Sequence, residues 1–240
     1  MHSFSINSKS IVFISEAVGN IVSQNGIDII TSSNNSIDNK KIPAFYVNQF
    51  DLSENKVIDK TWEEEERPVY TGVEANIIYK NGINIAAQFN RLMVANNKQD
   101  ISDTVFTTKA KNLYKMLNDK EIKPNQIGLN FFMLLSCENC DDYINDNFLN
   151  KSVFSKLGKS VLQPYVRVSY EITEYEKLNI AIYTAKKENI KNNTMSGDEF
   201  VVLEANYHYE LKSENTSANI IIDNSKKKLD LLKKLFSIES

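Results

Sequence analysis

Apolar and polar residues alternate along several stretches of this chain, with the period of two that is typical of strands with one covered face. The longest such stretch is 200–211. Its apolar set is Val201, Leu203, Ala205, Tyr207, Tyr209 and Leu211, and its polar set is Glu204, Asn206, His208 and Glu210. Shorter strands are predicted at 11–14, 27–30, 45–50, 73–80, 83–89, 165–172, 178–182 and 217–223. Because most of these carry one polar face, we expect a mostly antiparallel sheet.

Two further patterns refine the expected sheet. Asn81 and Gly82 separate the runs 73–80 and 83–89. Asn-Gly in such a place is a strong hairpin signal, because both turn positions need a positive φ. The run 126–135, by contrast, is apolar almost throughout. A strand that is apolar on both sides is typical of the middle of a sheet whose two faces are both covered.

Helical spacing of apolar residues marks two segments. The first is 102–120, with Ser102 or Asp103 as its N-cap and Pro124 preventing a long continuation. Its apolar stripe is Phe106, Ala110, Leu113 and Leu117. The second is a C-terminal helix for which Ser225 is the expected N-cap. Its apolar face is Leu229, Leu232, Leu235 and Phe236. A short helix is also predicted at 141–149.

The segments 73–79 and 203–209 share the triplet Glu-Ala-Asn, with apolar and polar positions in the same register. Each is followed by a predicted strand and then by an amphipathic helix. This order suggests two pseudo-equivalent strand–strand–helix halves, 1–122 and 123–240, within a single domain spanning 1–240. The expected fold class is α+β: a mostly antiparallel sheet with a mid-chain helix and a C-terminal amphipathic helix.

Composition narrows the classes of partner. The chain has 240 residues, enough for a full core, with 42% hydrophobic and 25% charged residues. A formal net charge of −3 provides no basic field, so we do not expect a nucleic-acid partner. The N-terminal residues lack a signal-peptide pattern, and no apolar run approaches the ~20 residues that span a bilayer. We therefore expect a soluble, cytoplasmic protein without a membrane partner.

Both cysteines of the chain lie in one motif, Cys137-Glu-Asn-Cys140, directly after the apolar run. Two thiols at this spacing can exchange with disulfides. A strand, the Cys-x-x-Cys motif and then a helix resembles the thioredoxin family, and Gln163-Pro164 before a strand resembles that family's active-site proline. Two departures are evident. Only 23 residues separate Cys140 from Pro164, and Asp141 with Asp142 would raise the pKa of a nearby thiol.

Other chemistries are incomplete in the sequence. A zinc site needs three or four ligands, and Cys137 with Cys140 supplies two, so a zinc ion would have to be bridged by two subunits. His208 shares the polar face of its strand with Glu204 and Glu210, which could orient it as a general base, but no nucleophile motif accompanies it. Phosphate-binding glycine motifs are absent. The sequence therefore predicts no cofactor.

The leading hypothesis is a non-enzymatic binding or assembly protein that acts through protein–protein contacts, by sheet edges or by the terminal helix. Its partner would be another protein or a second copy of the chain, giving a homo-oligomer. Two alternatives stay open. One is a thiol-redox or zinc-bridged protein that uses Cys137 and Cys140. The other is a hydrolase or transferase of unrecognised type that uses His208.

Overall fold

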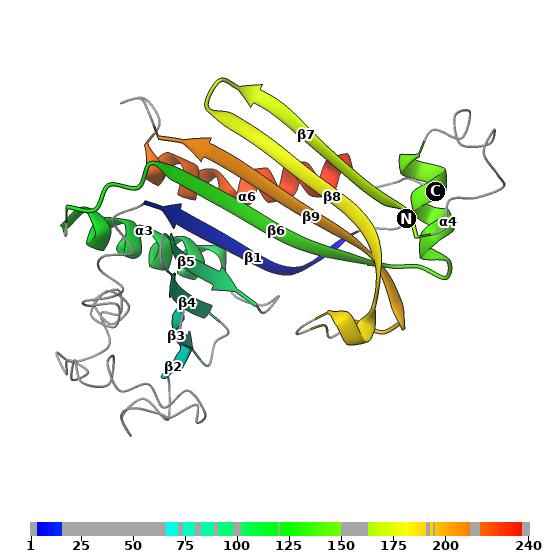
Figure 1. Cartoon of the computed structure of the whole chain (residues 1–240), viewed down its shortest axis with the longest axis horizontal. Coiled ribbons are helices and arrows are strands. Elements are labelled where there is room, and N and C mark those ends of the chain that lie inside the picture. Colours follow the sequence, from blue (N-terminus) through cyan, green and yellow to red (C-terminus); the bar gives the residue numbers. More distant parts are fainter. Residues whose placement is uncertain are drawn as a thin grey trace. The chain divides into compact units, whose positions relative to one another are not determined.

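The computed structural model describes residues 4–15, 66–71, 74–79, 83–88, 91–97, 102–119, 121–149, 163–190, 193, 195–211 and 217–236 (Figure 1). The chain divides into two compact units, each assembled from separate parts of the sequence. The first unit comprises Met1–Lys9, Asn130–His208 and Lys226–Ser240. The second comprises Ser10–Leu129 and Tyr209–Ser225. The strands predicted at 27–30 and 45–50, and the turn at 81–82, lie outside the described residues.

In the second unit, hydrogen-bonded neighbours follow the order β2-β3-β4-β5-β1, and β1 contributes its residues 10–14 to this unit. Their bounds are Ser5–Ile14 for β1, Glu66–Thr71 for β2, Glu74–Tyr79 for β3, Ile83–Gln88 for β4 and Arg91–Asn96 for β5. The strands β2 to β5 pair in antiparallel fashion one after another. Ile77 lies opposite Ile85 in the β3–β4 pair, which confirms the hairpin predicted around Asn81-Gly82.

Helix α3 (Asp103–Asp119) packs against β5 in this unit, and the predicted mid-chain helix is thereby confirmed. The Ser102 hydroxyl accepts a hydrogen bond from the backbone N–H of Val105 at 3.4 Å, so Ser102 acts at the N-terminus. Every residue of the predicted stripe is buried, and Met116 joins it. Facing residues Ile83, Ile85, Leu92 and Val94 have 0% exposed area, so helix and strands share one dry core.

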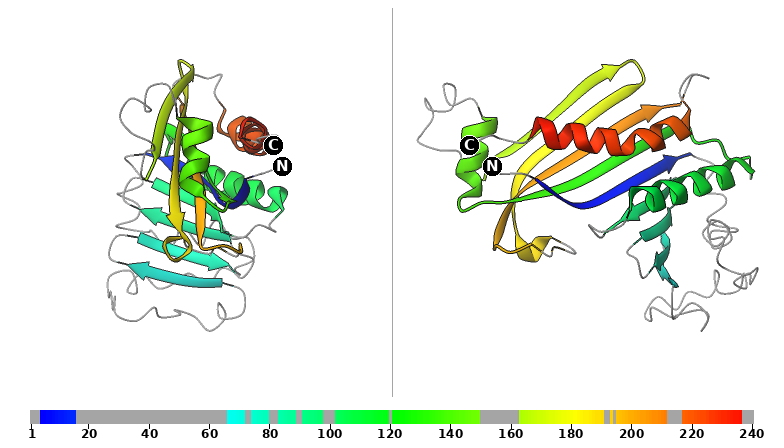
Figure 2. Two further views of the ribbon diagram at one scale, coloured as in Figure 1. Left: turned by 90° about the vertical axis from the view of Figure 1, so that its right-hand side faces the viewer. Right: turned by 180° about the vertical axis from the view of Figure 1, so that it is seen from behind.

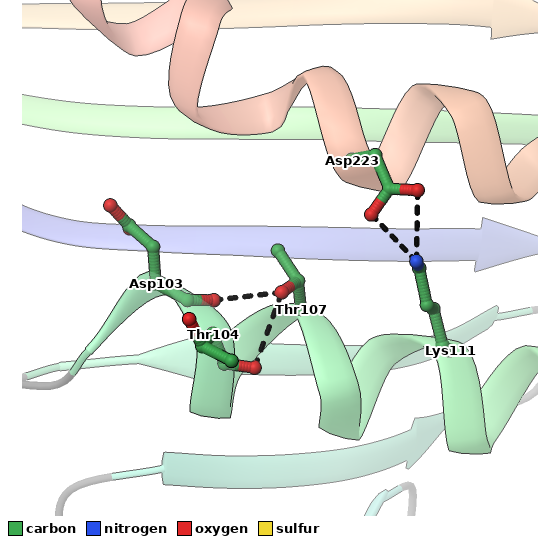
Figure 3. A network of polar contacts seen from close by, with 5 residues as sticks. All are labelled: Asp103, Thr104, Thr107, Lys111 and Asp223. Atoms are coloured by element: carbon green, nitrogen blue, oxygen red, sulfur yellow. Dashed lines mark hydrogen bonds and ion pairs between the residues drawn. The ribbon is translucent and has the colours of Figure 1, made fainter.

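Helix α3 makes one ion pair to a residue outside it and two side-chain hydrogen bonds within itself (Figure 3). The Lys111 ammonium lies 2.6 and 2.8 Å from the two carboxylate oxygens of Asp223. Thr107 donates its hydroxyl proton to the carbonyl oxygens of Asp103 and Thr104, at 2.9 and 3.2 Å. The ion pair is exposed and therefore a weak constraint.

In the first unit, the strands follow the order β6-β9-β8-β7 (Figure 1), with β6 contributing residues 130–136 and β9 residues 199–208. Their bounds are Gln126–Ser136 for β6, Tyr165–Thr173 for β7, Glu176–Lys186 for β8 and Glu199–Glu210 for β9. One face of β6 is buried from Ile127 to Leu135, whereas the other face is buried only at Gly128 and Leu134 and half-buried elsewhere, so the predicted burial on both faces is confirmed in part. β7 and β8 form an antiparallel hairpin whose register shifts between Glu171 and Thr173. A short 3-10 turn, η2 (Lys187–Asn189), follows β8.

Helix α6 (Ala218–Leu235) differs from the prediction at its start. Residues 217–223, predicted as a strand, open this helix instead, and Ser225 is not its N-cap but a buried residue inside it. The buried face is Ala218, Ile221, Ile222, Ser225, Leu229 and Leu232, whereas Leu235 is exposed. These spacings of three and four residues are helical, and the Ile220-Ile-Ile222 run resembles a strand only when read locally.

In the first unit, α6 lies along one face of the sheet (Figure 2). Lys228 fixes this packing, because its ammonium forms an ion pair with Glu176 of β8 and lies 4.8 Å from the ring centroid of Tyr207 of β9. Near the end of α6, Phe236 meets Phe4 edge-on, with 6.5 Å between ring centroids. Helix α4 (Cys140–Phe148), predicted at 141–149, packs against β8.

The structure therefore confirms an α+β fold with antiparallel sheet, a mid-chain helix and a C-terminal helix. The strand–strand–helix order occurs twice, as β4–β5–α3 and β8–β9–α6. The segments that suggested it are not equivalent, however. The first Glu-Ala-Asn lies in β3 and the second in β9, the strand directly before α6, so the sequence match joins strands in different places of the order.

Candidate functional site

The junction between β6 and α4 brings the two thiols together in an asymmetric arrangement. Asn139 is the N-cap of α4, and its side-chain oxygen accepts a hydrogen bond from the backbone N–H of Asp142 at 3.2 Å. Cys140 is the first residue of the helix and is fully buried. Its Sγ donates to the carbonyl oxygen of Cys137 at 3.7 Å. Cys137 lies before the N-cap and is partly exposed, whereas Cys140 is buried.

The pKa values of the two thiols are shifted in opposite directions. A hydrogen bond from the Cys140 thiol lowers the pKa of Cys137, and the backbone N–H of Val201 adds to this. Partial burial and the Glu199 carboxylate oppose the decrease without cancelling it. The pKa of Cys140 is raised, first because it donates to Cys137 and then because it is buried. Cys137 is therefore the thiol that ionises first.

Cys137 and Cys140 supply two possible metal ligands. Among the described residues, no group of three or more His, Cys, Asp or Glu side chains is placed so that it could hold a metal ion. A zinc ion at Cys137 and Cys140 would need ligands from another molecule. The zinc-bridged alternative thus stays a prediction about an assembly.

His208 lies half-buried on β9, on the face that also carries Glu204 and Glu210. Glu204 is engaged elsewhere, because its carboxylate accepts a hydrogen bond from the Tyr183 hydroxyl at 2.6 Å. Burial, followed by this bond, raises the pKa of Tyr183. Within the described part of the chain, no hydrogen bond or ion pair joins His208 to either glutamate. The structure therefore adds no orienting group to the proposed base, and its use in a hydrolase or transferase stays a prediction.

The edge position of strand β7 is a feature that the sequence pattern did not predict. It is the last strand in the order β6-β9-β8-β7, so only its β8 side is paired among the described strands. Tyr165, Tyr170 and Ile172 are 60%, 53% and 45% exposed. Alternation of apolar residues predicted this strand correctly, but the same alternation occurs in central and edge strands. Only the strand order shows that its apolar residues lie at an edge.

A chain of side-chain hydrogen bonds crosses the first unit and ends on β7. Asn206 of β9 donates to Asn130 of β6, Asn179 of β8 donates to Asn206 at 3.4 Å, and Ser169 of β7 donates to Asn179 at 2.7 Å. These four side chains lie in one row across the strands. Four residues from Ser169 along β7, the rings of Tyr165 and Tyr183 stack with centroids 5.6 Å apart. The row holds the middle of β7 in a fixed register against β8.

α6 presents a second exposed apolar set. Ile220, Leu231 and Leu235 lie on the outer side of the helix and are 57%, 45% and 61% exposed. They are spaced at helical intervals along one stripe, opposite the buried face. No described helix is both long enough and apolar enough to cross a membrane.

Comparison with known proteins gives no relative: no family model, curated protein or solved structure matches this chain.

Proposed function

We propose that this chain is a binding or assembly protein that acts through protein–protein contacts, with the outer edge of β7 as its contact surface. The observation that carries the proposal is the exposure of Tyr165, Tyr170 and Ile172 on a strand that ends its sheet. A strand edge offers a row of backbone donors and acceptors to another chain, and exposed aromatic side chains add apolar area to that pairing.

The sequence of β7 favours a second copy of the chain as the partner. Residues 167–171 read Arg-Val-Ser-Tyr-Glu, which is self-complementary in antiparallel pairing about Ser169. In that register, Arg167 lies opposite Glu171 of the second copy, and Val168 lies opposite its Tyr170. Opposite charges and apolar pairs directly across a strand pair are both stabilising. Shifting the centre to Val168 or Tyr170 removes the Arg–Glu pairs, so charge selects one register.

Three features of the structure suit this pairing. Residues 167–171 lie in the regular part of the β7–β8 ladder, before the register shift between Glu171 and Thr173. Ser169, at the proposed centre, is held by its hydrogen bond to Asn179. A two-fold axis through Ser169 gives an isologous contact, which closes at two copies and does not propagate into a fibre.

The test is a charge reversal with rescue. Arg167→Glu places two carboxylates opposite each other, twice in each dimer, and should raise the dimer dissociation constant at least about tenfold. Glu171→Arg should do the same with two cations. The double variant Arg167→Glu, Glu171→Arg restores the opposite charges and should restore the dimer. Mass in solution, measured over a dilution series by light scattering, gives the dissociation constants.

Lys227→Glu is the matched control, since it makes the same change of charge at an exposed position of α6. It should leave the dimer unchanged. A wild-type chain that is monomeric throughout the series would exclude self-association through β7. A double variant as weak as the single variants would show that another surface joins the copies.

A further inference from the structure

The arrangement of the two thiols points to a second property, independent of the contact at β7. A dithiol that exchanges with disulfides needs an accessible sulfur that attacks and a second sulfur within reach of the first. Cys137 is partly exposed, whereas Cys140 is buried. The Cys140 Sγ lies 3.7 Å from the Cys137 carbonyl oxygen, and its thiol is also close enough to donate a hydrogen bond to the Cys137 side chain. Accessibility and proximity are thus divided between the two residues as exchange requires.

The backbone around the motif holds the two thiols in this geometry. Asn139 caps α4 and also donates to the Asp142 carboxylate at 2.6 Å, which fixes the first turn and therefore Cys140. On the other side, Ser136 donates to the carbonyl oxygen of Ser196 at 3.3 Å. Gly197 packs so closely that an added Cβ would lie 3.0 Å from the Ser136 hydroxyl. The residues on both sides of the motif are therefore positioned by contacts within the first unit.

We propose that Cys137 and Cys140 form a redox-active dithiol, in which Cys137 attacks a disulfide of a substrate and Cys140 resolves the mixed disulfide. The sign of both pKa changes agrees with these roles, because Cys137 ionises first and Cys140 stays protonated. Cysteines three residues apart at the start of a helix can form a disulfide without a large movement of the backbone.

The exchange balances in two steps. The Cys137 thiolate attacks one sulfur of R–S–S–R′, forming Cys137–S–S–R and releasing R′–S⁻, which takes up a proton. The Cys140 thiol then loses its proton and attacks the Cys137 sulfur, releasing R–S⁻, which is also protonated. Two electrons and two protons have passed from the protein to the substrate. The products are the Cys137–Cys140 disulfide and two thiols.

Local charge indicates which disulfides would react well. Glu199 acts on the Cys137 sulfur, and Asp141 and Asp142 occupy the first turn of α4. These carboxylates repel anionic substrates and attract cationic ones. The chemical class is therefore a neutral or cationic disulfide, such as a basic peptide disulfide, in preference to an acidic one.

The experiment uses the reduced full chain and two small probes, cystamine, which is cationic, and oxidised glutathione, which is anionic. Wild-type protein treated with cystamine should lose the mass of two hydrogen atoms and retain no adduct. Cys140→Ser should stop at one cysteamine adduct on Cys137. Cys137→Ser should react at least about tenfold more slowly, since its remaining thiol is buried. Cystamine should react several-fold faster than oxidised glutathione at low salt, and this ratio should fall as salt is added.

Serine and alanine at position 140 give a matched pair. The Cys140→Ser hydroxyl still donates toward Cys137, whereas Cys140→Ala cannot, so the pKa of Cys137 should be higher in the alanine variant. A stable cysteamine adduct on wild-type protein would overturn the proposal, because Cys140 would not resolve it. So would equal rates in Cys140→Ser and Cys137→Ser, or zinc bound by the purified reduced protein and released on cysteine substitution. Circular dichroism establishes that each variant is folded.

Discussion

In the second unit, the apolar side chains of α3, β4 and β5 face one another and are buried, whereas in the first unit β7 leaves Tyr165, Tyr170 and Ile172 largely exposed. Both units are built from antiparallel strands followed by a helix, so secondary structure does not distinguish them. The difference is what covers each strand. A strand between two neighbours under a helix contributes to stability, and the last strand of a sheet is free to contribute to binding.

The ion pairs of α6 show the same contrast. In the second unit, Lys111 and Asp223 meet with side chains 40% and 57% exposed, and water screens their attraction. In the first unit, Lys228 and Glu176 are 23% and 15% exposed, and the Tyr207 ring also contacts the ammonium. Burial, helped by the nearby Glu176 carboxylate, raises the pKa of Tyr207 to about 12. Water therefore screens the Lys111–Asp223 pair more strongly than the Lys228–Glu176 pair.

Truncating one residue in each unit should give the largest difference. Phe106→Ala removes a buried ring from the core of the second unit and should lower the free energy of unfolding by about 3–5 kcal/mol. Tyr170→Ala removes a half-exposed ring and should cost less than about 1 kcal/mol. Urea unfolding followed by circular dichroism measures both. If Tyr170→Ala costs as much as Phe106→Ala, β7 belongs to a core and the contrast between the units is wrong.

Removing the charge from the two lysines tests the second contrast. Lys228→Met removes the ammonium from beside the partly buried Glu176 carboxylate and should cost about 2 kcal/mol. Lys111→Met should cost less than about 0.5 kcal/mol. The matched substitution keeps the aliphatic part of each side chain, so the difference reports the charge. Urea unfolding at low and high salt provides the measurement, and equal costs would contradict the assigned roles.

The smallest expected effect is a shift in the pH dependence of alkylation. Because the pKa of Cys137 is lowered from its ordinary value of 9.0, the folded protein should carry more thiolate below pH 9 than an unfolded chain does. Iodoacetamide should therefore modify folded Cys137 with a midpoint on the acid side of that value. Cys140, whose pKa is raised, should stay unmodified over the same range. Peptide mapping by mass spectrometry distinguishes the residues, and a common midpoint for both would contradict the asymmetry.

Most elements could be predicted from the sequence because their patterns are local. The stripe of α3 predicted its buried face, and the continuous apolar run predicted β6, of which one face is buried throughout and the other only in part. The error at 217–223 arose from a β-branched run that is helical here. Ile221 and Ile222 are buried together with Ala218 and Ser225, a set that only a helix places on one side.

The thiol site was predicted as a motif but not as an arrangement. The spacing of Cys137 and Cys140 allows them to meet in a turn or a helix, but not in an extended strand. The N–H of Val201 and the carboxylate of Glu199 come from the start of β9, some sixty residues further along the chain. No local pattern connects these residues with the thiols. The direction of each pKa shift therefore depends on contacts that only the folded chain creates.

By itself, the sequence determined the α+β class, the strands other than β2 and β5, helix α3, the later part of α6 and the pair of thiols, because each depends on residues close together in the chain. Tertiary structure decided which strand ends the sheet, which thiol is buried and which lysine is shielded from water. The physical reason is that burial and edge position are properties of neighbours. An alternating strand such as β7 has the same sequence pattern whether or not another strand pairs with its outer edge.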